Sequence, residues 1–273
     1  LLLLAAVPES PRWLTKRGRS AAAERILARI GGKDHARAEI AEIEDALAHE
    51  REESLGQLLE PAMRVPLLIG VGLAILQQIT GINVVLYYAP EIFKSAGVGT
   101  QQSINDTVIV GAVNLAFTLV AIGIVDRLGR KPLLLIASAG MGGSLAALGA
   151  AFARQGFGGP WVLVFVLTYV ASFAVAMGPV VWVVMSEIFP TRIRGRAMSV
   201  ATVCLWMACY AVTQLFPVML EVLKGSVFFV YAAICAGAFA FVWRLVPETK
   251  GKSLEEIERQ WYRPGGPAES GDG

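Results

Sequence analysis

Charged residues are scarce in this chain: they make up 17% of its 273 residues, whereas soluble domains usually contain about 25%. The shortfall is concentrated in long apolar blocks, and 55% of all residues are hydrophobic. This pattern excludes an ordinary soluble domain and predicts an all-α, multi-pass integral membrane protein surrounded by a lipid bilayer. The net charge of +2 gives no reason to expect nucleic acid as a partner.

Cysteine and histidine are also scarce. The three cysteines, Cys204, Cys209 and Cys235, lie inside apolar runs, and the two histidines, His35 and His49, lie in a polar segment. Their spacing matches neither a disulfide framework nor a metal site. The chain also lacks a nucleophile–base set and a phosphate-binding loop. We therefore expect no enzyme activity, no metal and no cofactor.

The chain begins without Met and without a basic lead segment. Leu1–Val7 could be mistaken for the apolar part of a signal peptide, but the missing charge favours the remnant of a preceding transmembrane helix over residues 1–7. Pro8–Leu14 contains two prolines around a charged pair, which predicts a helix stop at the membrane surface. A cytoplasmic helical linker is predicted to follow over residues 8–64.

The linker is predicted to contain two short soluble helices, Ser20–Ile30 and Asp34–Glu53, separated by Gly31 and Gly32. The second helix carries an apolar stripe among its charged residues. This stripe indicates that the helix is not merely solvated and also rests on another surface.

Six apolar blocks are long enough to cross a bilayer core, which needs about 20 helical residues. They define a transmembrane bundle over residues 65–246, followed by a cytoplasmic tail over residues 247–273 with a short helix that ends at Trp261. The predicted spans are Pro66–Phe93, Asn105–Val125, Pro132–Phe152, Trp161–Phe189, Ala197–Leu220 and Ser226–Val246.

The orientation of the bundle follows from the basic residues of its loops. The odd-numbered loops hold only Lys94, Arg154 and Lys224. Because cytoplasmic loops carry an excess of Lys and Arg, the linker, the even-numbered loops and the tail are predicted to be cytoplasmic. The basic residues of those loops and the tail are Arg127, Arg130, Lys131, Arg192, Arg194, Arg196, Lys250, Lys252, Arg259 and Arg263.

A group of polar residues lies near the centre of the first span. Gln77 follows Pro66 at a depth of about 16 Å along a helix, and Gln78 and Asn83 come next, with Gly81 loosening the helix between them. Polar groups at that depth are costly unless they face a cavity or a partner. They could hold helices together, but their number within a short stretch favours a polar ligand site.

The fourth span is interrupted at Gly178-Pro179, so the first span of each three-span repeat carries a break. Paired breaks at corresponding positions point to a transporter's binding site, although kinks are also ordinary packing features of membrane helices. Asn114, Trp182 and Trp206 are predicted to lie near the midplane as well. Carboxamides both donate and accept, and tryptophan offers an apolar face and an N–H, which suits a neutral polyhydroxylated ligand.

No ionisable residue lies deep inside a predicted span, because Glu91, Asp106, Glu187 and Glu221 all lie near span ends. A proton-coupling group would normally be an intramembrane carboxylate or histidine. This segment alone therefore offers no obvious proton carrier.

Several short motifs occur together in the chain, and in combination they are highly specific. They are Pro8-Glu9-Ser10-Pro11-Arg12, Gln77-Gln78-x-x-Gly81-x-Asn83, Asp126-Arg127-Leu128-Gly129-Arg130-Lys131, Gly178-Pro179-x-x-Trp182, Glu187-Ile188-Phe189-Pro190, Arg194-Gly195 and Pro247-Glu248-Thr249-Lys250-Gly251. From Pro8 to about Trp261, the chain resembles the C-terminal half of a sugar porter of the major facilitator superfamily. It is similar to bacterial xylose– and galactose–proton symporters and to facilitative glucose transporters.

The resemblance implies a six-helix C-terminal bundle in a cell (inner) membrane, which faces a missing N-terminal six-helix half across a sugar site at the midplane. Two positions depart from the family pattern: Leu205 replaces an amide that often precedes Trp206, and Cys209 occupies a further polar position. The positions that match the family's substrate contacts are Gln77, Gln78, Asn83, Tyr87, Asn114, Gly178, Trp182 and Trp206. Those that match its cytoplasmic gating charge network are Glu9, Arg12, Arg130, Glu187, Arg194 and Glu248.

The implied function is transport of a monosaccharide, either a hexose or a pentose, by alternating access, with proton-coupled symport as the expected mechanism. The family's coupling acid lies in the missing half, so facilitated diffusion stays open. The paired glutamines fit a polyol such as inositol equally well. A non-transporting sugar sensor is a further alternative, although such sensors usually carry longer cytoplasmic extensions than this tail.

Overall fold

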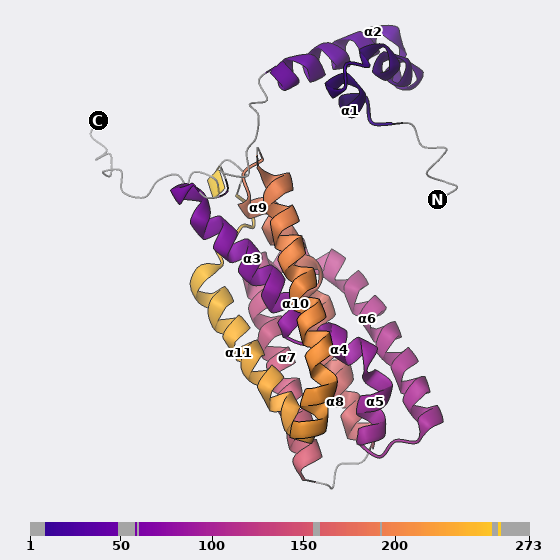
Figure 1. Ribbon diagram of the computed structural model, residues 1–273, viewed down its shortest axis with the longest axis vertical. Coiled ribbons are helices and arrows are strands. Elements are labelled where there is room, and N and C mark those ends of the chain that lie inside the picture. Colours follow the sequence, from indigo (N-terminus) through magenta and orange to yellow (C-terminus); the bar gives the residue numbers. More distant parts are fainter. Residues whose placement is uncertain are drawn as a thin grey trace, which may run out of the picture. The chain divides into compact units, whose positions relative to one another are not determined.

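The computed structural model describes residues 9–48, 58, 60–154, 159–191, 193–252 and 256–257. Over these residues the regular secondary structure is helical, with no strand, which confirms the predicted all-α class. The chain divides into two compact units, Leu1–Ser54 and Leu55–Gly273, whose helices are labelled in Figure 1. The helix remnant predicted for residues 1–7 lies outside the described residues.

The described part of the first unit, residues 9–48, contains two helices. Helix α1, Pro11–Lys16, begins at a proline, whose missing N–H costs nothing at the first position of a helix. The stretch predicted as a helix stop therefore also begins a new helix. Helix α2, Ser20–Ala48, is interrupted at Gly32, where φ is 87° and ψ is 174°, which confirms the predicted division at the glycine pair. The predicted end at Glu53 lies outside the described residues. Of the predicted tail helix up to Trp261, only Glu256 and Ile257 are described, and both are helical.

The second unit contains the predicted spans. Among the described residues, five stretches are long and apolar enough to cross a membrane, and the last of them, Arg194–Leu245, has 52 residues. This last stretch divides at Lys224, where φ is 48° and ψ is −134°, and Figure 1 shows the following helix running back along the bundle. The two halves of the long stretch correspond to the fifth and sixth predicted spans.

The helices of the second unit match the predicted spans closely, and two of the spans are broken. Short 3₁₀ turns at Pro61–Met63 and Lys224–Ser226 precede the first and last helices, and a π-helical segment, Phe173–Met177, interrupts the fourth span. The helices are α3 (Arg64–Ile79), α4 (Ile82–Tyr87) and α5 (Ala89–Ser95) of the first span, α6 (Thr100–Leu128), α7 (Arg130–Ala153), α8 (Gly159–Ser172) and α9 (Pro179–Ile188) of the fourth span, α10 (Arg194–Leu223) and α11 (Val227–Leu245).

Close helix packing organises this bundle: α7 packs along α11, and α3 packs along α10. Glycines permit close approaches between other helices of the bundle. A Cβ added at Gly72 would lie 2.5 Å from the ring of Phe241, and one added at Gly140 would lie 2.5 Å from the hydroxyl oxygen of Ser172. The second contact shows a small residue of the third span allowing close approach to the fourth.

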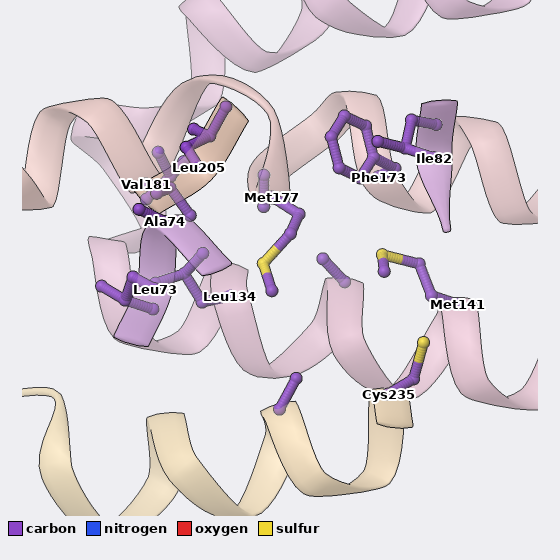
Figure 2. Close-up of a cluster of buried hydrophobic side chains, with 14 of the residues drawn as sticks. Leu73, Ala74, Ile82, Leu134, Met141, Phe173, Met177, Val181, Leu205 and Cys235 are labelled. Carbon is purple, nitrogen blue, oxygen red and sulfur yellow. The ribbon is translucent and has the colours of Figure 1, made fainter. Parts of the chain in front are cut away.

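The apolar core lies where these spans meet the broken helices. Figure 2 shows Leu73 of α3, Leu134 and Met141 of α7 and Met177 of the π-helical segment in one cluster. Cys235 of α11 belongs to the same cluster and is fully buried as a free thiol. This core holds both helix breaks against the rest of the bundle.

Candidate functional site

The first predicted break lies between α3 and α4. Gly81 has a φ of 99°, which residues with a Cβ rarely adopt, and an added Cβ would lie 2.9 Å from the ring of Tyr231. The carbonyl of Thr80 accepts a hydrogen bond from the hydroxyl of Tyr169 at 3.0 Å. The break is therefore held by a glycine and by side chains from two other spans.

The second predicted break has a distinct backbone geometry. In the π-helical segment Phe173–Met177, the carbonyl of Phe173 accepts a hydrogen bond from the N–H of Gly178 at 3.0 Å. Pro179, which has no N–H, then begins α9. Such an interruption leaves backbone carbonyls without their usual helical donors, and these carbonyls need other partners inside a membrane.

Gln77 joins the first span to this break in the fourth span. Its Nε2 donates hydrogen bonds to the carbonyl oxygens of Met177 at 2.8 Å and Gly178 at 2.9 Å. The side chain of Gln77 lies in the bundle interior, because the residue is only 3% exposed. A residue four positions before Gly81 is therefore in direct contact with the second break, which the internal repeat predicts at a depth similar to that of the first.

Two further carboxamides extend from this contact. Gln78 donates from Nε2 to Gln77 Oε1 at 3.4 Å, and Asn83 donates from Nδ2 to Gln78 Oε1 at 2.6 Å and to Cys209 Sγ at 3.1 Å. We call Gln77, Gln78 and Asn83 the carboxamide chain. It links α3, α4 and α10 to the break in the fourth span.

The other predicted ligand contacts are more exposed than the carboxamide chain. Tyr87 is 57% exposed, Trp182 is 37% exposed and Trp206 is 60% exposed, while Asn114 and Gly178 are half-buried. Large exposed aromatic side chains are typical of binding surfaces. The structure therefore joins the carboxamides to one another and leaves these aromatic residues accessible.

The two positions that depart from the family pattern have different surroundings. Leu205 is 2% exposed and packs in the apolar core beside Ala74 and Val181, as Figure 2 shows. Cys209 is instead bonded to Asn83. The substitution at Leu205 therefore adds to the core, whereas Cys209 is part of the polar site.

A cavity of about 560 Å³ opens elsewhere in the bundle, between α6, α7 and α8. Its lining is almost wholly apolar and includes none of the predicted ligand residues. Within the described ranges, no group of three His, Cys, Asp or Glu side chains is placed to hold a metal ion. The cavity lining consists of Val113, Phe117, Ile136, Ala137, Leu167, Thr168, Ala171, Ser172 and Val175.

Part of the predicted charge network assembles at the ends of α6, α7 and α9. Arg130 donates from Nη2 to Glu187 Oε1 at 3.0 Å and lies 3.1 Å from Asp126 Oδ1. The hydroxyl of Thr249, in the tail, donates to Glu187 Oε2. The side chains of Arg130 and Glu187 are 13% and 20% exposed, so salt screens this pair less than a fully solvated one.

Glu248 caps the N-terminus of α7. Its carboxylate accepts hydrogen bonds from the backbone N–H groups of Arg130 at 3.0 Å, Lys131 at 3.1 Å and Lys250 at 2.9 Å. Partial burial raises the pKa of this carboxyl, but the backbone N–H donors outweigh burial and hold the pKa below its ordinary value, because they favour the charged form. The positive end of the α7 dipole acts in the same direction.

The other predicted members of the charge network have other described contacts or belong to the first unit. Arg194 donates to the carbonyl of Phe189 and to the hydroxyl of Thr191, each at 3.2 Å. Glu9 forms an exposed ion pair within the first unit, and Arg12 belongs to that unit too. The participation of these three residues in the network stays a prediction.

Two contacts of the site were not anticipated from the sequence. One is the use of Gln77 to bond the backbone of Met177 and Gly178, and the other is the bond from Thr249 to Glu187. The sequence could have indicated the first contact. A helix break at Gly178-Pro179 leaves backbone carbonyls accessible to a donor, and Gln77 is a donor at a similar predicted depth. No local pattern signals the second contact, since it joins segments that are distant in the chain.

Comparisons with known proteins agree with this arrangement. The family model described as "Sugar (and other) transporter" matches residues 1–261. The D-xylose-proton symporter of Escherichia coli (strain K12) is 46% identical over 268 residues, which cover 96% of this chain and 54% of that protein. The arabinose-proton symporter of Bacillus subtilis (strain 168) is 42% identical over 263 residues, which cover 96% of this chain and 57% of that protein.

A solved structure gives the same result. The structure of a major facilitator superfamily proton:xylose symporter bound to 6-bromo-6-deoxy-D-glucose matches with a TM-score of 0.74 and 46% identity. The match covers 95% of this chain and 56% of the other chain. The chain thus spans about half the length of the curated relatives that it matches.

Proposed function

The chain belongs to the sugar (and other) transporter family, within the sugar porters of the major facilitator superfamily, and from this we propose that it forms the C-terminal half of a monosaccharide transporter. It is a multi-pass protein of the inner membrane. In the proposed transporter, this six-helix bundle faces an N-terminal six-helix bundle, and the two rock about a sugar site between them.

The carboxamide chain is the observation that carries this proposal. Polar side chains inside an apolar bundle are costly unless they stabilise the structure or bind a ligand. Gln78 keeps one Nε2 hydrogen that bonds to no described residue, and Asn83 Oδ1 accepts from no described residue. These remaining groups match the hydroxyls of a sugar, which both donate and accept.

The proposed sugar site extends from the carboxamide chain to the exposed aromatic residues. Trp182 and Trp206 offer flat apolar surfaces on which the C–H face of a sugar ring can pack, and their N–H groups can reach its hydroxyls. The proposed contacts are Gln78, Asn83, Tyr87, Asn114, Gly178, Trp182 and Trp206. The eighth predicted position, Gln77, has both Nε2 hydrogens on carbonyl oxygens and Oε1 on Gln78, so it would act through Gln78.

Proton coupling is the expected mechanism. Both relatives described above are proton symporters by name. In this bundle, the buried acid Asp106 lies near the start of α6, where Gln102 donates to it at 2.6 Å. We therefore expect the carboxylate that couples sugar transport to proton transport to come from the N-terminal half.

The charge network is proposed to act as a cytoplasmic latch. Arg130, Glu187 and Glu248 join the ends of α7 and α9 to the tail. Glu9 and Arg12, together with Arg194, would complete the network when the two bundles close on the cytoplasmic side. Opening of this side would then break the ion pairs that connect the bundles.

A polyol such as inositol is the second candidate ligand, because the carboxamide chain recognises hydroxyls and not the ring oxygen of a sugar. A non-transporting sugar sensor is a further alternative, in which the same site binds sugar without transport. Transport is favoured because the two paired breaks supply flexible points on either side of the site.

The test is an uptake panel with the complete protein in proteoliposomes. Radiolabelled D-xylose, L-arabinose, D-glucose and myo-inositol would be compared with and without an imposed proton gradient. We expect saturable, stereospecific uptake of a pentose or hexose that the gradient accelerates. Saturable sugar binding without uptake would favour the sensor, and uptake of myo-inositol alone would replace the monosaccharide by a polyol.

A further inference from the structure

The backbone fixes the order of donors and acceptors along the carboxamide chain. The carbonyl oxygens of Met177 and Gly178 can only accept hydrogen bonds, so Gln77 must turn its NH₂ group toward them. Each carbonyl takes one of the two hydrogens. Gln77 is therefore left with Oε1, which can only accept, as its contribution to Gln78.

The orientation of each later amide follows from this anchor. Gln78 turns Nε2 toward Gln77 Oε1, which leaves Gln78 Oε1 for Asn83. Asn83 then turns Nδ2 toward Gln78 and toward Cys209. Among the described residues none donates to Asn83 Oδ1, so the group that Asn83 keeps for a ligand is an acceptor.

Gln78 and Asn83 alone do not determine which of their groups donate and which accept. Turning both amides over exchanges their donors and acceptors and preserves one hydrogen bond between them. Gln77 removes this ambiguity, because turning its amide over would place Oε1 against two carbonyl oxygens with no hydrogen between them. Gln77 and Gln78 are 3% and 7% exposed, so water has little access to compensate.

We propose that Gln77 is a positioning residue, which anchors on the break of the fourth span and thereby orients Gln78 and Asn83 toward the ligand. This inference rests on the proposed function, since the ligand is the monosaccharide. It makes Asn83 Oδ1 the acceptor for a hydroxyl that donates. It also makes the geometry of Met177 and Gly178 a determinant of ligand recognition, because these carbonyls hold the anchor.

The ligand test uses D-xylose and its monofluoro analogues, in which fluorine replaces a hydroxyl and cannot donate. In the complete protein, fluorine at the hydroxyl facing Asn83 should weaken binding about tenfold or more. In Gln77→Leu this penalty should fall to less than about threefold, because the amide of Asn83 can turn over. An unchanged pattern of penalties would overturn the inference. Gln101→Leu, which removes an exposed carboxamide near the start of α6, should keep the parent pattern.

A measurement without ligand separates this inference from the proposed function. The substitutions Cys204→Ala and Cys235→Ala leave Cys209 as the single thiol of this chain. In the complete protein, the rate at which a membrane-permeant maleimide alkylates Cys209 is then measured. Gln77→Leu should raise the rate severalfold, because Asn83 is no longer held against Cys209 Sγ.

The shorter Gln77→Asn should raise the rate as well, and it retains a polar side chain should the leucine variant fold poorly. Unchanged alkylation in these variants would show that Gln77 does not anchor the chain. Faster alkylation in the variants, together with a parent protein that binds no sugar, would refute the proposed function and leave the anchor in place.

Discussion

At the scale of single residues, the residue type and the predicted depth of a side chain do not determine its role in the site. Sequence reasoning assigns Gln77, Gln78 and Asn83 to the same ligand site, because all three are carboxamides near a predicted midplane. The structure gives them different roles. Gln77 donates both of its Nε2 hydrogens to backbone carbonyls 100 and 101 residues away in the chain, whereas Asn83 Oδ1 accepts from no described residue. That difference depends on the backbone path of another span, which no local pattern contains.

Removal of the carboxamides nearest the ligand should weaken sugar binding. Gln78→Ala and Asn83→Ala each remove a buried hydrogen-bonding group, which costs about 1–3 kcal/mol and therefore roughly ten- to a hundredfold in affinity. Equilibrium binding of the transported sugar to purified, folded variants measures this loss. Cys204→Ala, a change in a half-buried thiol on α10, is the control and should leave affinity unchanged. Parent-like affinity in Gln78→Ala and Asn83→Ala would remove both from the site.

The glycine at the first break should resist substitution. Gly81→Ala places a Cβ on a residue with φ of 99° and brings it 2.9 Å from Tyr231, so we expect destabilisation by about 1–3 kcal/mol. Thermal unfolding of the purified protein in detergent measures the change. Gly143→Ala is the matched control, because a Cβ there has no neighbour within 4 Å, and it should be neutral or slightly stabilising. Equal unfolding temperatures for the two variants would contradict the strained-glycine account.

At the scale of helices, periodicity and length were sufficient for the spans but not for their local irregularities. The six predicted spans and the glycine division of α2 are present, with ends displaced by a few residues. The π-helical segment was not predicted beyond a break at Gly178-Pro179, because the extra residue of a π turn is decided by packing and not by apolar spacing. The same holds for the second interruption of the first span at Tyr88.

The tail segment after α11 should be held to α7 by the ionised form of Glu248. The pKa of this carboxyl is lowered in the folded protein, so its stabilisation is fully present above the ordinary pKa of about 4.5. It is lost as pH falls through the lower folded pKa. Glu248→Gln, which keeps the shape but not the charge, should cost about 1–2 kcal/mol at neutral pH.

Unfolding temperatures of the parent and Glu248→Gln across a pH series test this expectation. The difference between them should be largest at neutral pH and should disappear in acid. Glu221→Gln is the control, because Glu221 is exposed and lies near the C-terminal end of α10. Its difference in unfolding temperature from the parent should not depend on pH in this way. A difference that grows as pH falls would have the wrong sign and would reject the capping role.

At the scale of the whole molecule, the basic loops predict which side of the membrane each end of the bundle faces. Gly99 lies in the short connection between α5 and α6, and Lys252 lies in the tail beyond α11. Single cysteines at these two positions, on a background without the native thiols, should label from opposite sides of intact cells. Labelling of both from outside with an impermeant maleimide would refute the orientation. The same reagent applied to permeabilised cells is the control for accessibility.

Residues 1–273 alone should not catalyse transport under the proposed mechanism. Alternating access needs two bundles that move about the site, and this chain provides one complete bundle. Exposure of its polar face to hydrocarbon is unfavourable, so we expect the isolated chain to self-associate or to be degraded. Uptake by proteoliposomes would be compared for the chain alone, the complete protein and the two halves co-expressed. Saturable, stereospecific uptake by the chain alone would show that the half-transporter proposal is wrong.

The π-helical segment has a consequence for gene comparison. A π turn contains one residue more than an α turn. Deletion of a single codon within Phe173–Met177 would therefore convert the π turn into an α turn and leave the face that α9 presents, Trp182 included, nearly unchanged. A deletion elsewhere in α8 or α9 would instead turn the following residues by about 100°. We therefore expect homologous genes that differ by one codon in this span to differ within this segment.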